Sequence, residues 1–272
     1  MDQKLAVLFM PDDMTLTKEQ APLMLRPILF CPILTWMVEE LMGRGIERFF
    51  IVSDKRAHDM MRPYVPEKAD VVYVDGARHG EELLTLLKDE KGSVLIVNGA
   101  VLPVGVFSGG AVYSADAKEC CKVLKEHGAF AAFPKGAEIT KGFLPVGDDE
   151  ELRSAQDMCR RKIADKHFAA GVSIMDPNNT YIDPRVKIGS GTVILPGTIL
   201  RGRTVIGKNC TIGPNAIIRD CTVGDETEVN ASQLNESTVG AHTTVGPFAY
   251  VRPNSKIGDH VKVGDFVEIK NS

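Results

Sequence analysis

The sequence carries no excess of positive charge. Its 272 residues include 32 lysines and arginines against 36 aspartates and glutamates, which gives a net charge of −4. General binders of nucleic acids or membrane surfaces present a basic face, so the charge balance argues against both partners and favours a small molecule. No apolar run approaches the roughly 18 residues of a membrane-spanning helix, and Met1–Met10 is too short an apolar start for a signal peptide.

Cysteine is scarce, and none of the six residues has the Cys-x-x-Cys spacing that is typical of zinc and redox sites. We therefore interpret the cysteines as reduced core thiols of a cytoplasmic protein, and we predict no metal site. They are Cys31, Cys120, Cys121, Cys159, Cys210 and Cys221.

From residue 182 onward the sequence repeats with a period of six. An aliphatic residue heads each repeat, and glycine often follows it. No α-helix has this period, whereas short strands that alternate with tight turns do, and three hexads then close one coil of a parallel β-helix. The regular anchors are Ile182, Ile188, Ile194, Leu200, Ile206, Ile212 and Ile218, then Val239, Val245, Val251, Ile257, Val263 and Ile269, with five-residue steps between the two series.

Residues 1–148 follow a different pattern, in which short β-rich runs alternate with segments of helical spacing. This alternation predicts a doubly wound α/β domain. The predicted strands are 4–10, 49–52, 71–74 and 94–97, and the predicted helices are 33–42 and 81–87. Such sheets bind ligands beyond the carboxyl ends of their strands, where this chain has Ser53-Asp54, Asp75-Gly76 and Asn98-Gly99. Turns and helix caps use the same residue types, and we favour that interpretation.

A charged segment joins the two halves. Acids come first, at Asp149–Glu151, and bases follow at Arg160–Lys162. This order suits the dipole of a helix that ends at Gly171. We therefore divide the chain into an α/β domain at 1–148, a linker helix at 149–171 and a β-helix at 172–272.

One edge of the predicted solenoid carries long polar side chains, whereas glycine follows every anchor of another face and most anchors of the third are followed by small or apolar residues. The polar residues follow the anchors of a single face, and they are Asp183, Arg201, Arg219, Asn235, Arg252 and Lys270. Arg252 and Lys270 then lie on successive coils, about 4.8 Å apart at the backbone. Two cations this close repel unless they splay into water or share an anion. We interpret Arg252 and Lys270 as a phosphate site, and Arg201 and Arg219 as a solvated edge.

Two histidines, His242 and His260, are spaced like Arg252 and Lys270. Stacked imidazoles are possible metal ligands, but two of them fall short of the three or four protein ligands that zinc sites use. We therefore favour exposed turn residues at both positions.

Three segments of the second half contain specific motifs: Met175–Pro184, Gly246–Pro253 and Gly264–Lys270. With them, residues 149–272 resemble the bacterial bifunctional N-acetylglucosamine-1-phosphate uridyltransferase / glucosamine-1-phosphate N-acetyltransferase. The resemblance implies a left-handed β-helix, a homotrimer, and two steps of UDP-N-acetylglucosamine synthesis that use acetyl-CoA and Mg²⁺. In that family an Arg-Pro arginine and the lysine that ends Phe-Val-Glu-x-Lys hold the sugar phosphate, and they match Arg252 and Lys270.

The first half departs from the nucleotidyltransferase motifs of that family. Where the family has a glycine-rich loop, this chain has Phe9–Met14, without a glycine. A family lysine aligns with Leu23, a Gly-Lys-Pro motif with Phe30–Pro32, and the magnesium-binding aspartate with Ala100. We therefore expect a degenerate nucleotidyltransferase-like domain.

The acetyltransferase half departs in another way. The family's catalytic His and Tyr and its acetyl-CoA groove follow the lysine motif, and this sequence stops at Ser272. We therefore assign no catalytic or cofactor-binding residue and expect both active sites to be incomplete. Two functions stay open: a transferase of UDP-N-acetylglucosamine synthesis, or a non-catalytic trimer that binds a sugar phosphate or serves as a scaffold.

Overall fold

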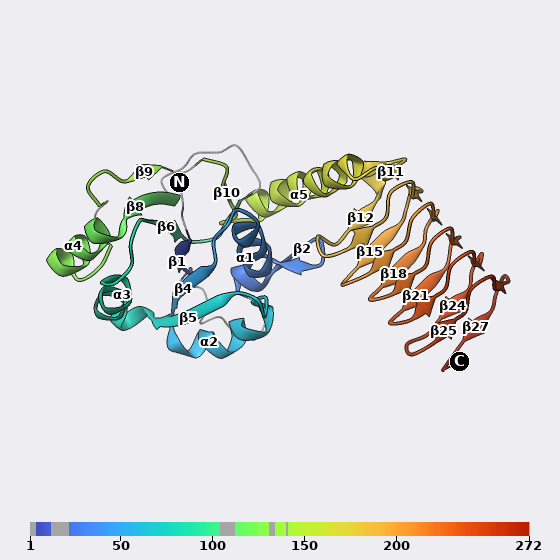
Figure 1. Cartoon of the computed structure of the whole chain (residues 1–272), viewed down its shortest axis with the longest axis horizontal. Coiled ribbons are helices and arrows are strands. Elements are labelled where there is room, and N and C mark those ends of the chain that lie inside the picture. Colours follow the sequence, from blue (N-terminus) through green and yellow to red (C-terminus); the bar gives the residue numbers. More distant parts are fainter. Residues whose placement is uncertain (1–3, 12–21, 104–111, 131–133, 140, 272) are drawn as a thin grey trace. The chain divides into compact units, whose positions relative to one another are not determined.

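The computed structural model describes residues 4–11, 22–103, 112–130, 134–139 and 141–271 (Figure 1). The chain forms two compact units. The first comprises Met1–Ile28 and Pro32–Ala155, and the second comprises Leu29–Cys31 and Gln156–Ser272.

The first unit is built on a six-stranded sheet in the order β5-β4-β1-β6-β8-β9. Strands β5, β4, β1 and β6 are parallel, and β8 and β9 add an antiparallel edge. The parallel part has the strand order of a doubly wound sheet, which confirms the predicted fold class, whereas the antiparallel edge was not predicted. The strands are β1 Leu5–Phe9, β4 Arg48–Ser53, β5 Asp70–Asp75, β6 Ser93–Asn98, β8 Val112–Asp116 and β9 Glu138–Ile139.

Helices follow the strands of this sheet and bury their apolar sides against it. Val7, Phe50 and Ile96 of the sheet share one hydrophobic cluster with Leu83 of α3 and Leu124 of α4. The helices are α1 Ile33–Gly43, α2 Lys55–Met61, α3 His79–Leu87 and α4 Ala117–His127. Shorter elements of this half of the chain are β2 Pro27–Ile28, β3 Cys31–Pro32, β7 Val101–Leu102, β10 Leu144–Pro145, and the 3-10 turns η2 Leu23–Leu25, η3 Arg62–Tyr64 and η4 Gly76–Arg78.

Helix α5, Asp149–Ala169, begins with a reciprocal cap. The carboxylate of Asp148 accepts hydrogen bonds from the backbone N–H groups of Glu150 and Glu151 at 2.9 and 2.8 Å. The side chain of Glu151 in turn accepts from the N–H of Gly147 at 2.5 Å. This pairing satisfies N–H groups that the first turn of a helix leaves without partners.

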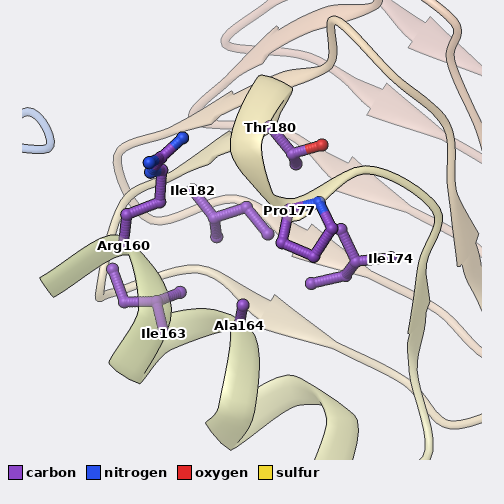
Figure 2. Close-up of a pocket in the computed structure, with 7 residues that line it drawn as sticks. All are labelled: Arg160, Ile163, Ala164, Ile174, Pro177, Thr180 and Ile182. Atoms are coloured by element: carbon purple, nitrogen blue, oxygen red, sulfur yellow. The ribbon is translucent and has the colours of Figure 1, made fainter. Parts of the chain in front are cut away.

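The later part of α5 covers the open end of the solenoid's first coil. Figure 2 shows Ile163 and Ala164 of α5 facing Ile174 and Ile182 of that coil across a cavity of about 10 Å³. The guanidinium of Arg160 donates a hydrogen bond to the carbonyl oxygen of Asn178 at the rim. Repeat solenoids need such a cover, because the terminal coil otherwise exposes its apolar interior to water.

The second unit is a left-handed parallel β-helix, as predicted, with three parallel sheets that we call the first, second and third solenoid sheets. The first sheet consists of β11 Ser173–Ile174, β14 Val193–Ile194, β17 Thr211–Ile212, β20 Glu228–Val229, β23 Thr244–Val245 and β26 Lys262–Val263. The second sheet consists of β12 Tyr181–Ile182, β15 Ile199–Arg201, β18 Ile217–Arg219, β21 Gln233–Asn235, β24 Tyr250–Val251 and β27 Glu268–Ile269. The third sheet consists of β13 Lys187–Ile188, β16 Val205–Ile206, β19 Thr222–Val223, β22 Thr238–Val239 and β25 Lys256–Ile257. A 3-10 turn, η5 Pro177–Asn179, lies in the first coil.

The hexad anchors fill the interior of the solenoid, where Ile194, Leu200 and Ile218 have no exposed surface. Glycine follows the anchors of the third sheet because neighbouring coils approach closely there. A Cβ atom on Gly189 would lie 2.7 Å from the backbone of Gly207, a distance that no side chain tolerates. On the second sheet, polar side chains follow the anchors instead of glycine.

Candidate functional site

The polar side chains predicted to line one edge do lie on the second solenoid sheet. We call Asp183, Arg201, Arg219, Asn235, Arg252 and Lys270 the polar column. Val251 of β24 pairs with Ile269 of β27, and the backbone N–H of Arg252 donates to the carbonyl oxygen of Ile269 at 2.9 Å. Arg252 and Lys270 follow these anchors directly, so they occupy equivalent positions on neighbouring coils.

The guanidinium of Arg252 is held by an acid that the sequence reasoning did not single out. Its Nη1 atom lies 3.0 Å from Oε1 of Glu268, and the two side chains are 41% and 57% exposed. Glu268 precedes the anchor Ile269, whereas Arg252 follows the anchor Val251. The arginine therefore leans from the polar column across the face of the sheet. The signal was available in the sequence, since Glu268 lies within the Phe-Val-Glu-x-Lys motif.

Other members of the polar column are paired as well. Asp183 is fully buried, and it accepts hydrogen bonds from Nε and Nη2 of Arg185 at 2.9 and 2.7 Å. Nη2 of Arg219 lies 2.7 Å from Oε1 of Glu236. Arg219 thus forms an ion pair with a surface acid, while Arg201 is exposed. Surface pairs of this kind contribute about 1 kcal/mol at most, so they orient the side chains more than they stabilise the fold.

Asn235 and Tyr250 form a contact between two coils next to Arg252. Asn235 is a buried polar residue, with 8% of its surface exposed, and its Nδ2 atom donates to the hydroxyl oxygen of Tyr250 at 3.3 Å. Tyr250 is half-buried on β24 and pairs in register with Glu268. Arg252, Glu268 and Tyr250 therefore belong to one patch of the second sheet.

The two histidines lie at a corner of the solenoid. The rings of His242 and His260 stack with centroids 4.7 Å apart and planes 6° from parallel. Nδ1 of His242 lies 3.3 Å from Oε2 of Glu226. Across the described ranges of the chain, no three His, Cys, Asp or Glu side chains are grouped closely enough to hold a metal ion.

In the first unit, a pocket of about 610 Å³ opens at the carboxyl ends of β1, β4 and β5. Residues at its wall include Met10, Pro11, Ser53, Lys55, Asp75 and His79. The pocket lies where doubly wound sheets place their ligands.

The acids at these strand ends accept hydrogen bonds from backbone N–H groups. Asp54 accepts the N–H of Arg56 at 2.8 Å and also binds the Arg56 guanidinium at 2.6 Å, which lowers the pKa of Asp54 to about 2. Asp75 accepts the N–H of Ala77 at 3.0 Å. Both side chains therefore cap helical turns, which is the role that their residue types favoured.

The positions that we expected to align with the family's phosphate and metal ligands are apolar and buried. Leu23 and Cys31 are 8% and 0% exposed. Ala100 is 9% exposed, and its carbonyl oxygen accepts the N–H of Val146 at 2.9 Å. The segment that replaces the glycine-rich loop continues into residues 12–14, which lie outside the described residues.

Comparisons with known proteins find similarity mainly in the solenoid. A family model described as GMPPB C-terminal domain matches residues 176–272. Bifunctional protein GlmU of Geobacillus sp. (strain WCH70) is 43% identical over 119 residues, which is 44% of this chain and 26% of that protein. GlmU of Alkaliphilus oremlandii (strain OhILAs) is 51% identical over 100 residues, which is 37% of this chain and 22% of that protein. The C-terminal half of the chain is similar to GlmU.

The match spans about a quarter of the length of the GlmU proteins, 26% and 22% in these two cases. Two solved structures are also similar over most of the chain. The acetyltransferase domain of PglB from Neisseria gonorrhoeae has a TM-score of 0.34 at 12% identity, and covers 98% of this chain and 93% of that one. GDP-perosamine N-acetyl transferase from Caulobacter crescentus has a TM-score of 0.36 at 14% identity, and covers 98% and 89%.

In the part of the chain that the structure describes, no helix is both long and apolar enough to span a membrane. The six cysteines are buried thiols without disulfide bonds.

Proposed function

We propose that the solenoid binds a sugar phosphate at Arg252 and Lys270, as a member of the transferase group that makes UDP-N-acetylglucosamine. The placement of these two cations on neighbouring coils is the observation that supports the proposal most. A phosphate that lies between them receives charge-assisted hydrogen bonds from both. The GlmU relationship makes glucosamine 1-phosphate the first ligand to test.

Binding is expected to be weak. The guanidinium that would hold the phosphate already pairs with Glu268 at 3.0 Å, so the phosphate must break that pair and approach a carboxylate. Both cations are also open to water, which screens their charge. We therefore expect an affinity in the millimolar range that falls as salt is added.

We infer that the first unit does not transfer a uridyl group. Magnesium prefers carboxylate oxygens, and Ala100 offers a buried methyl group at the aligned position. Leu23 cannot neutralise a phosphate as the family lysine would. Phosphate positioning, charge neutralisation and metal binding act together in such chemistry, so losing two of them removes the reaction.

We further propose a homotrimer that packs through the solenoid, and a cytoplasmic location. The six free thiols support the location, since oxidising compartments favour disulfides.

Calorimetric titration with glucosamine 1-phosphate tests the proposed site. Arg252→Ala and Lys270→Ala should each abolish measurable binding. Arg201→Ala is the matched control, because Arg201 occupies the same column on an earlier coil. The control should bind as the unaltered chain does. Equal binding by Arg252→Ala and the unaltered chain would refute the site.

A further inference from the structure

We infer that the proposed phosphate site takes a nucleoside diphosphate, free or linked to a sugar, whose base stacks on Phe248 and Phe266 while its phosphates lie at Arg252 and Lys270. The inference rests on the proposed function of that site and narrows the class of its ligand. Two exposed phenyl rings lie on the same two coils as the two cations.

Phe248 and Phe266, which we call the aromatic ladder, present two stacked rings to solvent. The ring centroids are 5.4 Å apart, and the ring planes are 24° from parallel. Phe248 is nevertheless 60% exposed and Phe266 is 78% exposed, so each side chain leaves most of its surface in water. Burial within the chain therefore does not account for two phenylalanines at equivalent positions of successive coils, and such a patch is typical of a binding surface.

The backbone of both phenylalanines is left-handed, with φ of 59° at Phe248 and 57° at Phe266. They lie at the corner between the first and second solenoid sheets, three residues after the paired anchors Val245 and Val263. At this corner φ is positive on earlier coils too, where the residues are Gly197, Asn215 and Ala231. Glycine and asparagine adopt the left-handed conformation readily, whereas a bulky side chain is strained in it. Strain that the packing of the chain does not require points to a role outside the fold.

The aromatic ladder and the two cations lie at opposite edges of the same pair of strands. Phe248 and Arg252 lie on either side of β24, and Phe266 and Lys270 lie on either side of β27, which pairs with β24. Four residues separate ring from cation on each coil, so their Cα atoms are at most about 14 Å apart. A ligand that reaches both edges is therefore elongated, with a planar group at one end and an anion at the other.

A nucleoside diphosphate has this form, because a ribose and the α-phosphate separate its base from its β-phosphate. A sugar phosphate has no planar ring, so it would leave the aromatic ladder unused. Charge sets the direction of the ligand. Asp265 and Glu268 are exposed acids close to Phe266 in the sequence, so the aromatic edge suits an uncharged base, whereas the phosphates belong at Arg252 and Lys270.

The size of the apolar patch favours a single ring over a protein partner. The exposed apolar side chains of this corner are Phe248, Phe266 and Val267, which offer far less than the roughly 800 Å² per partner that a stable protein interface buries. A base needs only one ring to stack on, and every base has a face that can do so. The ladder therefore fits a base of any kind.

The test is calorimetry of the full chain at low salt, with uridine 5′-diphosphate and inorganic pyrophosphate as separate probes. Pyrophosphate offers the same two phosphates without a nucleoside, so it reports the cations alone. Uridine diphosphate should bind about tenfold more tightly than pyrophosphate, which is the effect of stacking one base on an aromatic side chain. Arg252→Ala should weaken both probes.

Phe266→Asn removes one ring and keeps a residue that suits the left-handed backbone, as Asn215 does at the same corner of an earlier coil. The affinity for uridine diphosphate should fall about tenfold, while the affinity for pyrophosphate and the urea midpoint stay unchanged. A ladder that only stabilised the coils would give the opposite result, with a lower midpoint and unchanged binding. Phe168→Ala is the control, because it removes a 43% exposed phenyl ring on α5, and it should bind both probes as the unaltered chain does.

The outcomes separate the inference from the proposed function. If the unaltered chain binds both probes equally while Arg252→Ala loses them, the aromatic ladder holds no base and the phosphate site stands. If the unaltered chain binds neither probe at tens of millimolar, the site and the inference are both wrong. If light scattering shows that Phe266→Asn alone loses an assembly that the unaltered chain forms, the ladder is a contact between copies, and the inference is overturned.

Discussion

Replacing Glu268 by glutamine should strengthen phosphate binding at Arg252 and Lys270. The substitution keeps the size of the side chain and removes its charge. In the unaltered chain, a phosphate that approaches Arg252 must break an ion pair of 3.0 Å and then lie near the displaced carboxylate. Both costs are absent in Glu268→Gln.

The expected size of the effect follows from the exposure of the pair. Side chains that are 41% and 57% exposed are well screened, so the ion pair contributes about 1 kcal/mol at most. Repulsion between the carboxylate and the bound phosphate adds an amount of similar size, about 1 kcal/mol at 4 Å in water. Together the two terms amount to about 1 to 2 kcal/mol, so the affinity should rise by about fivefold to thirtyfold, since about 1.4 kcal/mol corresponds to a factor of ten.

Calorimetric titration with inorganic phosphate measures this gain directly. Glu236→Gln is the control, because Glu236 also pairs with an arginine at 2.7 Å, and that arginine, Arg219, belongs to the coil before it and not to the coil of Arg252. The control should leave the affinity unchanged. An unchanged or weaker affinity in Glu268→Gln would refute the competition between Glu268 and phosphate, and an equal gain in both variants would show a general effect of net charge.

Three other predictions follow from the fold. Burial lowers the pKa of His167 to about 4, and the charge of Lys166 adds to the effect. The unfolded chain therefore binds a proton more readily than the folded chain, and the solenoid unit should lose about 3 kcal/mol of stability as the pH falls from 6.5 to 4. Urea unfolding should show that His167→Leu abolishes this loss. Pyrophosphate release from UTP and N-acetylglucosamine 1-phosphate with Mg²⁺ should stay at the no-protein background, and release that disappears in a chain without residues 1–148 would overturn the inferred loss of uridyl transfer. Light scattering should give the mass of three chains, whereas a monomer at micromolar concentration would contradict the proposed trimer.

In the first unit, the sequence pattern predicted the parallel strands but not the antiparallel ones. The four predicted strands all correspond to parallel strands of the sheet, because continuous apolar runs are typical of strands that are buried on both faces. The antiparallel strands β8 and β9 were missed. The run Val112–Asp116 alternates apolar and polar residues only briefly, and its place in the sheet depends on pairing with β6, which lies nearby only after the chain has folded.

The sequence alone determined the solenoid, since a repeat of six residues places each anchor directly above the one a coil before it. That stacking also brings Arg252 and Lys270 together, because each of them directly follows an anchor of the same column. The pairing of Arg252 with Glu268, and of Asn235 with Tyr250, was decided only by the tertiary structure. Backbone register fixes which residues share a coil position, but the direction of a long side chain depends on which neighbours offer it a hydrogen bond, and those neighbours come from other coils.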